Sequence, residues 1–166
     1  GEIYNYIELR DSLIQKGFYF KTSSDTEVLL KILMFYGHSG VSMLQGMFAF
    51  VFHDKETNNW IAARDPFGIK PLYYCSLMDE LIFASEIKPF TLHPDITIAR
   101  DNKSLREYLA FQFCLKDSTL FSNIRKIEPG FCIIGCGALI KKRICFWKNN
   151  YQINPDLSED ATISEI

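Results

Sequence analysis

Apolar residues recur at helical spacing near the start of the chain, and the pattern predicts a first helix over roughly residues 4–16. The positions that share one face are Ile3, Ile7 and Ile14, with Tyr6, Leu9 and Leu13 alongside. Gly17 follows the last periodic position, where a glycine commonly ends a helix.

A second helix is predicted directly after Ser24. Ser24 and Glu27 have the spacing of a capping box, in which the serine hydroxyl accepts from a free backbone N–H while the glutamate reaches back to the cap. The apolar positions that follow at helical spacing are Val28, Leu29, Ile32, Leu33 and Tyr36. Gly37 ends this helix.

After Gly46 the pattern changes to short apolar runs separated by turn residues. Residues 47–52 are continuously apolar, which predicts a strand that is covered on both faces. The spacing of the runs predicts three hairpins: 47–52 with 60–63, 72–75 with 81–84, and 131–134 with 140–147. With a further helix predicted over Leu105 to Phe113, the fold class is α+β, with mainly antiparallel strands and helices outside them.

Size and charge narrow the classes of function. A chain of 166 residues with 48% hydrophobic residues fits one folded domain. Its net charge of -2 offers no basic face for nucleic acid or for an anionic membrane surface. No apolar run approaches the roughly 20 residues of a membrane span. We expect a cytoplasmic protein without nucleic-acid or membrane partners.

Cysteine and histidine residues give no sign of a metal site. The five cysteines lie at positions 75, 114, 132, 136 and 145, mostly within apolar runs, which predicts reduced and buried thiols. Cys132 and Cys136 have no second ligand pair at zinc spacing. His38, His53 and His93 each lack a matching partner, so we interpret them as structural or surface residues.

Several motifs occur in an order that resembles one enzyme family. They are Gly1-Glu2-Ile3-Tyr4-Asn5-Tyr6, Ser24-Asp25-Thr26-Glu27, Gly46-Met47-Phe48-Ala49-Phe50, Ala63-Arg64-Asp65-Pro66-Phe67-Gly68-Ile69-Lys70-Pro71-Leu72 and Phe83-Ala84-Ser85-Glu86-Ile87-Lys88. Together they resemble the class II glutaminase domain of asparagine synthetases. The resemblance covers residues 1 to about 153 and implies the αββα sandwich of N-terminal-nucleophile hydrolases.

The resemblance implies that the parent enzyme hydrolyses the side-chain amide of glutamine. An N-terminal Cys attacks the amide, and fixed N–H donors stabilise the oxyanion that forms. By the resemblance, one donor is the backbone N–H of Gly1 and the other is an Asn that precedes it. We expect the sequence to be truncated upstream of Gly1, so that the nucleophilic Cys is absent, Gly1 is a compromised donor and the fragment alone is inactive.

Glu2 and Asp25 match the carboxylates that bind the α-amino group of glutamine in the family. A cationic ammonium group needs such acceptors, and charge-assisted hydrogen bonds are the strong ones. Taken alone, each position has a simpler interpretation as a first-turn carboxylate favoured by the helix dipole. The ordered set of motifs favours glutamine binding, and for Asp25 both interpretations are compatible.

Other charged residues in the motifs are better interpreted as structural. Arg64, Asp65 and Lys70 flank a turn rich in Gly and Pro, where the Arg and Asp are expected to satisfy backbone groups or each other. Ser85 and Glu86 are expected to cap a short helix first and to act in function second.

By this resemblance, residues 1–153 form a partial type 2 glutamine amidotransferase domain, and residues 154–166 form a linker and the start of a missing synthetase domain. Glutamine and that domain are the implied partners, and a homodimer stays open. The parent would pass ammonia to an ATP- and magnesium-dependent amidation of aspartate, while the fragment itself would hold no cofactor. The alternatives are a glutaminase domain that serves a cell-surface sugar or a secondary metabolite, and a non-catalytic interaction domain.

Overall fold

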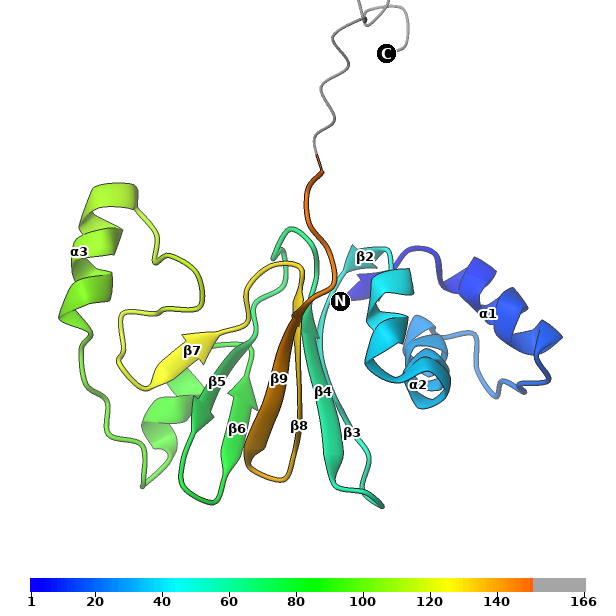
Figure 1. Cartoon of the computed structure of the whole chain (residues 1–166), viewed down its shortest axis with the longest axis horizontal. Coiled ribbons are helices and arrows are strands. Elements are labelled where there is room, and N and C mark those ends of the chain that lie inside the picture. The colour runs from blue at the N-terminus through cyan, green and yellow to red at the C-terminus, as the bar shows by residue number, and fades with distance from the viewer. Residues whose placement is uncertain (151–166) are drawn as a thin grey trace, which may run out of the picture.

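Two antiparallel sheets with helices on their outer sides form the structure, a computed structural model that describes residues 1–150 (Figure 1). The structure has four layers. Two helices cover one sheet, the second sheet packs against the first, and short helical segments cover the second sheet. This arrangement confirms the predicted α+β class and its αββα layers. The linker predicted over residues 154–166 lies outside the described residues.

The larger sheet has the strand order β3-β4-β8-β9 and the smaller sheet has the order β6-β5-β7. The strands of the larger sheet are β3 (Ala49–His53), β4 (Asn59–Arg64), β8 (Phe131–Cys136) and β9 (Leu139–Cys145). Those of the smaller sheet are β5 (Tyr73–Ser76), β6 (Leu81–Ala84) and β7 (Ile124–Lys126). The three predicted hairpins, β3 with β4, β5 with β6 and β8 with β9, are confirmed.

Strand β4 is buried on both faces because its side chains alternate between two cores. Trp60 and Ala62 point toward the smaller sheet, where Trp60 lies in the same cluster as Tyr74. Ile61 and Ala63 belong to the cluster under the helices on the other side. The central strand of the sandwich is therefore β4, and it holds the two sheets and the helical layer together.

The prediction of one strand over residues 47–52, covered on both faces, is wrong. The segment divides into β2 (Gly46–Met47) and β3, with Phe48 between them. Within the described residues β3 pairs with β4 alone, and Val51 is 41% exposed. The run is apolar because Phe48 is buried in the cluster under the helices and Phe50 and Phe52 of β3 pack against that cluster. Strand β3 itself lies at the edge of its sheet.

Helices α1 (Tyr6–Gln15) and α2 (Asp25–Tyr36) cover the larger sheet, and a 3-10 helix, η1 (Gly37–Met43), follows α2. The predicted apolar face of the first helix is partly wrong. Leu9 and Leu13 are buried, whereas Ile7 and Ile14 are 56% and 49% exposed. Helix α1 packs against α2 at the outer edge of the molecule, so only the stripe that contains Leu9 and Leu13 meets the core.

The N-terminus of α2 is capped as predicted by Ser24, whose Oγ accepts from the Thr26 N–H at 3.1 Å. The predicted return contact of the capping box, from Glu27 to Ser24, is wrong. Glu27 does not reach back to Ser24; its carboxylate accepts from the N–H groups of Lys21 and Thr22 and from the Thr22 hydroxyl. Glu27 therefore fixes the loop that leads into the helix.

These hydrogen bonds predict a pH-dependent contribution to stability from Glu27. The backbone N–H of Lys21, followed by the Thr22 hydroxyl, lowers the pKa of Glu27 from 4.5 to about 2. A carboxyl group with a depressed pKa in the folded state stabilises above its unfolded pKa and loses that contribution as the pH falls through the folded value. Glu27→Gln is expected to lower the melting temperature at neutral pH, and the difference from wild type should narrow between pH 4.5 and 2.

Circular dichroism melts over this pH range measure the effect. Glu56→Gln, at an exposed position of the β3–β4 turn, is the matched control and should leave the melting temperature unchanged at each pH. A Glu27→Gln difference that stays constant down to pH 2 would contradict the assignment.

The outer face of the smaller sheet is covered by the 3-10 helix η2 (Lys88–Leu92) and by the segment that leads to α3 (Asn102–Phe111). The capping role predicted for Ser85 and Glu86 is wrong, because η2 begins after Ile87 and has no side-chain cap. Helix α3 begins three residues before its predicted start, since Asp101 accepts from the N–H groups of the first turn. No helix within residues 1–150 has the length and hydrophobicity needed to cross a membrane.

Candidate functional site

A two-stranded ribbon at one end of the larger sheet positions Glu2. Strand β1 (Glu2–Ile3) pairs antiparallel with β2, with Glu2 opposite Met47 and Ile3 opposite Gly46. The Tyr4 N–H extends the pairing by donating to the Gln45 carbonyl at 2.7 Å. Because Ile3 is buried beneath the helices, the ribbon is anchored to the core while Glu2 is exposed to solvent.

Asn5 is a positioning residue that the analysis of the sequence did not single out. Its Nδ2 donates to the Met43 carbonyl and its Oδ1 accepts from the Gln45 N–H, both at 2.9 Å. Asn5 stands at the N-cap of α1 but makes no capping hydrogen bond, because its side-chain amide is used to hold the segment before β2. Its place within the Gly-Glu-Ile-Tyr-Asn-Tyr motif was the available signal.

Asp25 reaches the ribbon from the first turn of α2. Its Oδ2 accepts from the Ile3 N–H at 3.0 Å, across a separation of 22 residues. This N–H belongs to the peptide bond that follows Glu2, so the two predicted carboxylate residues lie beside each other. The structure thus brings the residues Glu2 and Asp25 together. Asp25 lies in the first turn of α2 and also accepts a hydrogen bond from a distant part of the chain.

Neither carboxylate is neutralised by a protein cation within the described part of the chain. The ion pairs found between residues 1 and 150 involve other acidic groups: Glu27, Glu80, Glu107 and Asp117. Carboxylates without a cationic partner attract a small cation or an ammonium group. No cluster of three or more His, Cys, Asp or Glu residues with metal-binding geometry occurs among the described residues.

Backbone packing explains the glycine at position 1. A Cβ atom at Gly1 would lie 2.9 Å from the Met47 carbonyl oxygen and 3.1 Å from the Cα of Phe48. The chain's own backbone therefore excludes a side chain at this position. Gly46, opposite Ile3, is crowded further, since its Cβ would lie 2.1 Å from the Glu2 carbonyl oxygen.

The Arg64–Lys70 turn is structural, as predicted. Asp65 is fully buried, and its carboxylate accepts from the N–H groups of Phe67, Ile69 and Lys70 at 2.9–3.0 Å. Arg64 donates to three carbonyl groups, those of Gly68, Lys70 and Ile127. The Asp65 N–H donates to the Phe48 carbonyl, so this network also supports the backbone against which Gly1 packs.

The cysteines have no environment that would activate a thiolate. All five are free, and burial raises the pKa of Cys75, Cys114 and Cys132, the last to about 11. Cys75 and Cys132 are fully buried, as predicted, whereas the other three are partly exposed. Among the described residues no cysteine is hydrogen-bonded to Glu2 or Asp25, and the hydroxyl groups beside Asp25 are those of Ser24 and Thr26, at 3.5 and 3.3 Å from its Oδ1.

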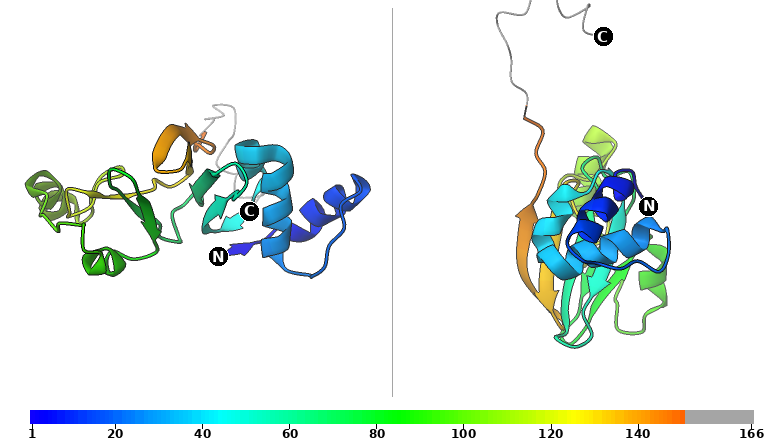
Figure 2. Two further views of the ribbon diagram at one scale, coloured as in Figure 1. Left: turned by 90° about the horizontal axis from the view of Figure 1, so that it is seen from below. Right: turned by 90° about the vertical axis from the view of Figure 1, so that its right-hand side faces the viewer.

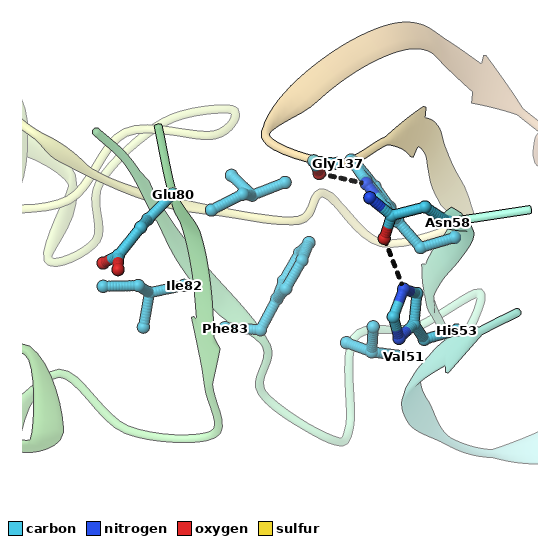
Figure 3. Close-up of a pocket in the computed structure, with 9 residues that line it drawn as sticks. Val51, His53, Asn58, Glu80, Ile82, Phe83 and Gly137 are labelled. Atoms are coloured by element: carbon cyan, nitrogen blue, oxygen red, sulfur yellow. Dashed lines mark hydrogen bonds between the residues drawn. The ribbon is translucent and has the colours of Figure 1, made fainter. Parts of the chain in front are cut away.

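A hollow of about 440 Å³ lies elsewhere, between the edge strands β3 and β6 (Figure 3). His53 on one wall is bonded to Asn58 at 2.9 Å, and Glu80 on the other pairs with His93 at 3.2 Å. The remaining lining is mainly apolar, including Phe83. The polar side chains His53 and Glu80 already have partners, and the described residues that line the hollow include no Ser, Thr, Cys or Lys that could act as a nucleophile. This hollow is therefore a poor candidate for catalysis.

Comparison with known proteins shows the family of the chain. Residues 1–144 match the glutamine amidotransferase domain family. The whole chain is 44% identical to asparagine synthetase (glutamine-hydrolysing) 1 of Bacillus subtilis, of which it covers 26%. It is 34% identical over 99% of its length to the amidase chyE of Penicillium rubens, of which it covers 24%. The chain therefore spans about a quarter of the length of these relatives.

Among solved structures, the chain is similar to glutamine phosphoribosylpyrophosphate amidotransferase from Bacillus subtilis. The TM-score is 0.57 at 26% sequence identity, over 89% of this chain and 28% of the other. The likeness covers most of the chain, and it agrees with the predicted sandwich.

Proposed function

Since the chain belongs to the glutamine amidotransferase domain family, we propose that it binds glutamine in the glutaminase domain of an asparagine synthetase-like enzyme. The observation that carries the proposal is the hydrogen bond between the Ile3 N–H and Asp25. This bond holds the Asp25 carboxylate beside the backbone of Glu2, and neither side chain pairs with a protein cation among residues 1–150, which supports a role for both in accepting from the α-ammonium group of glutamine.

In the proposed reaction, a Cys thiolate supplied from upstream of Gly1 attacks the side-chain amide carbon of glutamine. The carbonyl oxygen becomes an oxyanion, and the N–H of Gly1 and an upstream Asn side chain stabilise it. The amide nitrogen takes up the proton released from the Cys thiol and leaves as ammonia. Water then hydrolyses the thioester to glutamate and the free thiol. Within the present chain, Glu2 and Asp25 bind and orient the substrate.

The remainder of the enzyme is part of the same proposal. Residues 1–153 form the type 2 amidotransferase portion, and residues 154–166 lead to a synthetase domain that uses ATP and magnesium to amidate aspartate with the released ammonia. The chain covers only 26% of the asparagine synthetase it resembles, which leaves ample length for such a domain. The enzyme is proposed to act in the cytoplasm, and a homodimer stays open.

Asp25→Asn tests the role of the negative charge in the full-length protein. The asparagine Oδ1 can still accept from the Ile3 N–H, so the ribbon stays in place while the charge is lost. Loss of a charge-assisted hydrogen bond, about 1.5–3 kcal/mol, is expected to raise the KM for glutamine about 10- to 100-fold. Glutamate release measures this effect, and synthesis from added ammonium salt should be unchanged.

Asp11→Asn, on the exposed surface of α1, is the matched control and should keep the wild-type KM. An unchanged KM in Asp25→Asn would exclude Asp25 from glutamine binding. Absence of glutamine hydrolysis in the wild-type protein would instead favour the non-catalytic interaction domain. Hydrolysis without aspartate-dependent product would favour an amidotransferase with another acceptor, which the relative chyE also leaves open.

A further inference from the structure

A second cavity, of about 270 Å³, lies between the outer face of the smaller sheet and the end of α3. Figures 1 and 2 show α3 and the smaller sheet at the end of the molecule away from α1 and α2. Tyr73 of β5 and Lys126 of β7 are directly opposite each other in the sheet, and both line the cavity. Residues 112–114 and 118–121, which follow α3, line it from the other side.

Hydrogen bonds to the sheet hold the loop that lines the cavity in one conformation. Thr119 is 4% exposed, and its hydroxyl donates to the Ile124 carbonyl at 2.7 Å and accepts from the Phe121 N–H at 3.1 Å. The Lys126 N–H donates to the Asp117 carbonyl at 2.9 Å, which ties the loop to β7. The cavity is therefore preformed, as small-molecule sites usually are.

Among the described residues that line the cavity, Lys126 is the only one with a side chain that is charged near neutral pH. Its Nζ donates to the Cys114 carbonyl at 2.6 Å, and no carboxylate lies within 4 Å of it among residues 1–150. Asp117 and Glu128 act on Lys126 from outside the cavity, and Asp117 is itself paired with Arg143 at 2.7 Å.

The Lys126 ammonium group therefore gains from an anionic partner. Burial lowers the pKa of Lys126, because the surrounding protein takes the place of part of its hydration. An ammonium group has three N–H donors, so Lys126 can donate to a ligand as well as to Cys114. A carboxylate that accepts from it would form a charge-assisted hydrogen bond, which is one of the strong ones.

The rest of the lining limits the size and the chemistry of such a ligand. It is mainly aromatic or aliphatic: Tyr73, Ile87, Tyr108, Phe113, Leu120 and Phe121. A water molecule occupies about 30 Å³, so a cavity of about 270 Å³ holds roughly nine non-hydrogen atoms, the size of one aromatic ring with a carboxylate group. A zwitterionic amino acid fits less well, because no Asp or Glu among the described lining residues can accept from its ammonium group.

We propose that this cavity binds a small aromatic monocarboxylate, with its carboxylate on Lys126 and its ring against Tyr73 and Phe113. The site is separate from Glu2 and Asp25, which attract a cation, and it does not rest on the proposed function. It gives the domain a second small-molecule site of opposite charge preference.

Calorimetric titration of the full-length protein with sodium benzoate tests the proposal. One site per chain is expected, with a Kd of about 0.1–1 mM for a ligand of this size. Benzamide has the same ring without the negative charge, and it should bind about tenfold more weakly. Equal affinity for the two compounds, or no saturable binding of benzoate up to about 10 mM, would overturn the proposal.

Two pairs of variants locate the bound benzoate. Lys126→Met removes the charge but keeps an unbranched side chain, and it should weaken benzoate binding about tenfold while benzamide binding stays the same. Lys142→Met, at an exposed position of β9 outside the cavity, is the matched control and should keep the wild-type Kd.

Phe113→Ala supplies a test that changes no buried group, since Phe113 is 57% exposed. Loss of this aromatic wall should weaken the binding of both compounds about fivefold. Phe67→Ala, at a 72% exposed position outside the cavity, is its control and should have no effect. Wild-type affinity for benzoate in either Lys126→Met or Phe113→Ala would place the ligand elsewhere and contradict the assignment.

Discussion

Replacement of Asp65 with alanine is expected to lower the free energy of unfolding by about 3–5 kcal/mol. The carboxylate is completely buried and accepts three backbone N–H bonds, from Phe67, Ile69 and Lys70. Alanine would leave those donors without a partner in a turn that water cannot easily reach. It would also remove the negative charge beside Arg64, whose guanidinium group is half-buried and bonded only to neutral carbonyl groups among the described residues.

Urea titration followed by tryptophan fluorescence measures the change, because Trp60 lies in the core between the two sheets. Asp79→Ala is the matched control, since Asp79 is exposed in the β5–β6 turn, and we expect a change within about 0.5 kcal/mol. Asp65→Asn keeps one acceptor oxygen and should lie between the two. An Asp65→Ala effect as small as that of Asp79→Ala would show that the turn does not depend on this carboxylate.

The turn around Asp65 shows how far sequence alone predicts the molecule. Its Gly and Pro residues indicate a rigid connection, and its Arg and Asp indicate satisfied backbone groups, which the hydrogen bonds confirm. The sequence does not reveal that the Asp65 N–H reaches Phe48, or that Gly130 reaches Asp65. Such bonds join segments distant along the chain, and no local pattern records them.

The helices show the same limit. Ser24, Gly17 and Gly37 mark helix boundaries correctly because capping and positive φ are local requirements. Ile7 and Ile14 have the right spacing for burial and yet are exposed, because burial depends on which layer the helix meets. Apolar residues at 47–52 likewise indicated a central strand, whereas the tertiary fold gives that position to β4.

The candidate site likewise combines features that the sequence predicts with contacts that it does not reveal. The order of the motifs in the sequence predicts that Glu2 and Asp25 act as a pair. Their proximity depends on the bond from the Ile3 N–H to Asp25, and the ribbon depends on Asn5, which local sequence rules assign to helix capping. Long-range hydrogen bonds therefore bring the two residues together, and their role in glutamine binding stays a prediction.

Gly46→Ala is expected to lower the free energy of unfolding by about 3 kcal/mol or more and to impair glutamine binding in the full-length protein. Gly46 has a φ of +151°, and an added Cβ would lie 2.1 Å from the Glu2 carbonyl oxygen. Relief of this contact requires β1 to separate from β2. Glu2 would then move relative to Asp25, so the KM for glutamine should rise even in molecules that remain folded.

Gly17→Ala is the matched control because Gly17 also has a positive φ, +87°, but a Cβ there would meet nothing within 4 Å. Gly17→Ala should lower the free energy of unfolding by only about 1 kcal/mol, the cost of the unfavourable backbone conformation, and the KM for glutamine should stay at the wild-type value. Urea titration and glutamate release measured on both variants separate the two causes. Equal losses of stability would mean that positive φ alone accounts for Gly46, whereas a larger loss with a raised KM would assign the glycine to the close approach of the two strands that hold Glu2 in place.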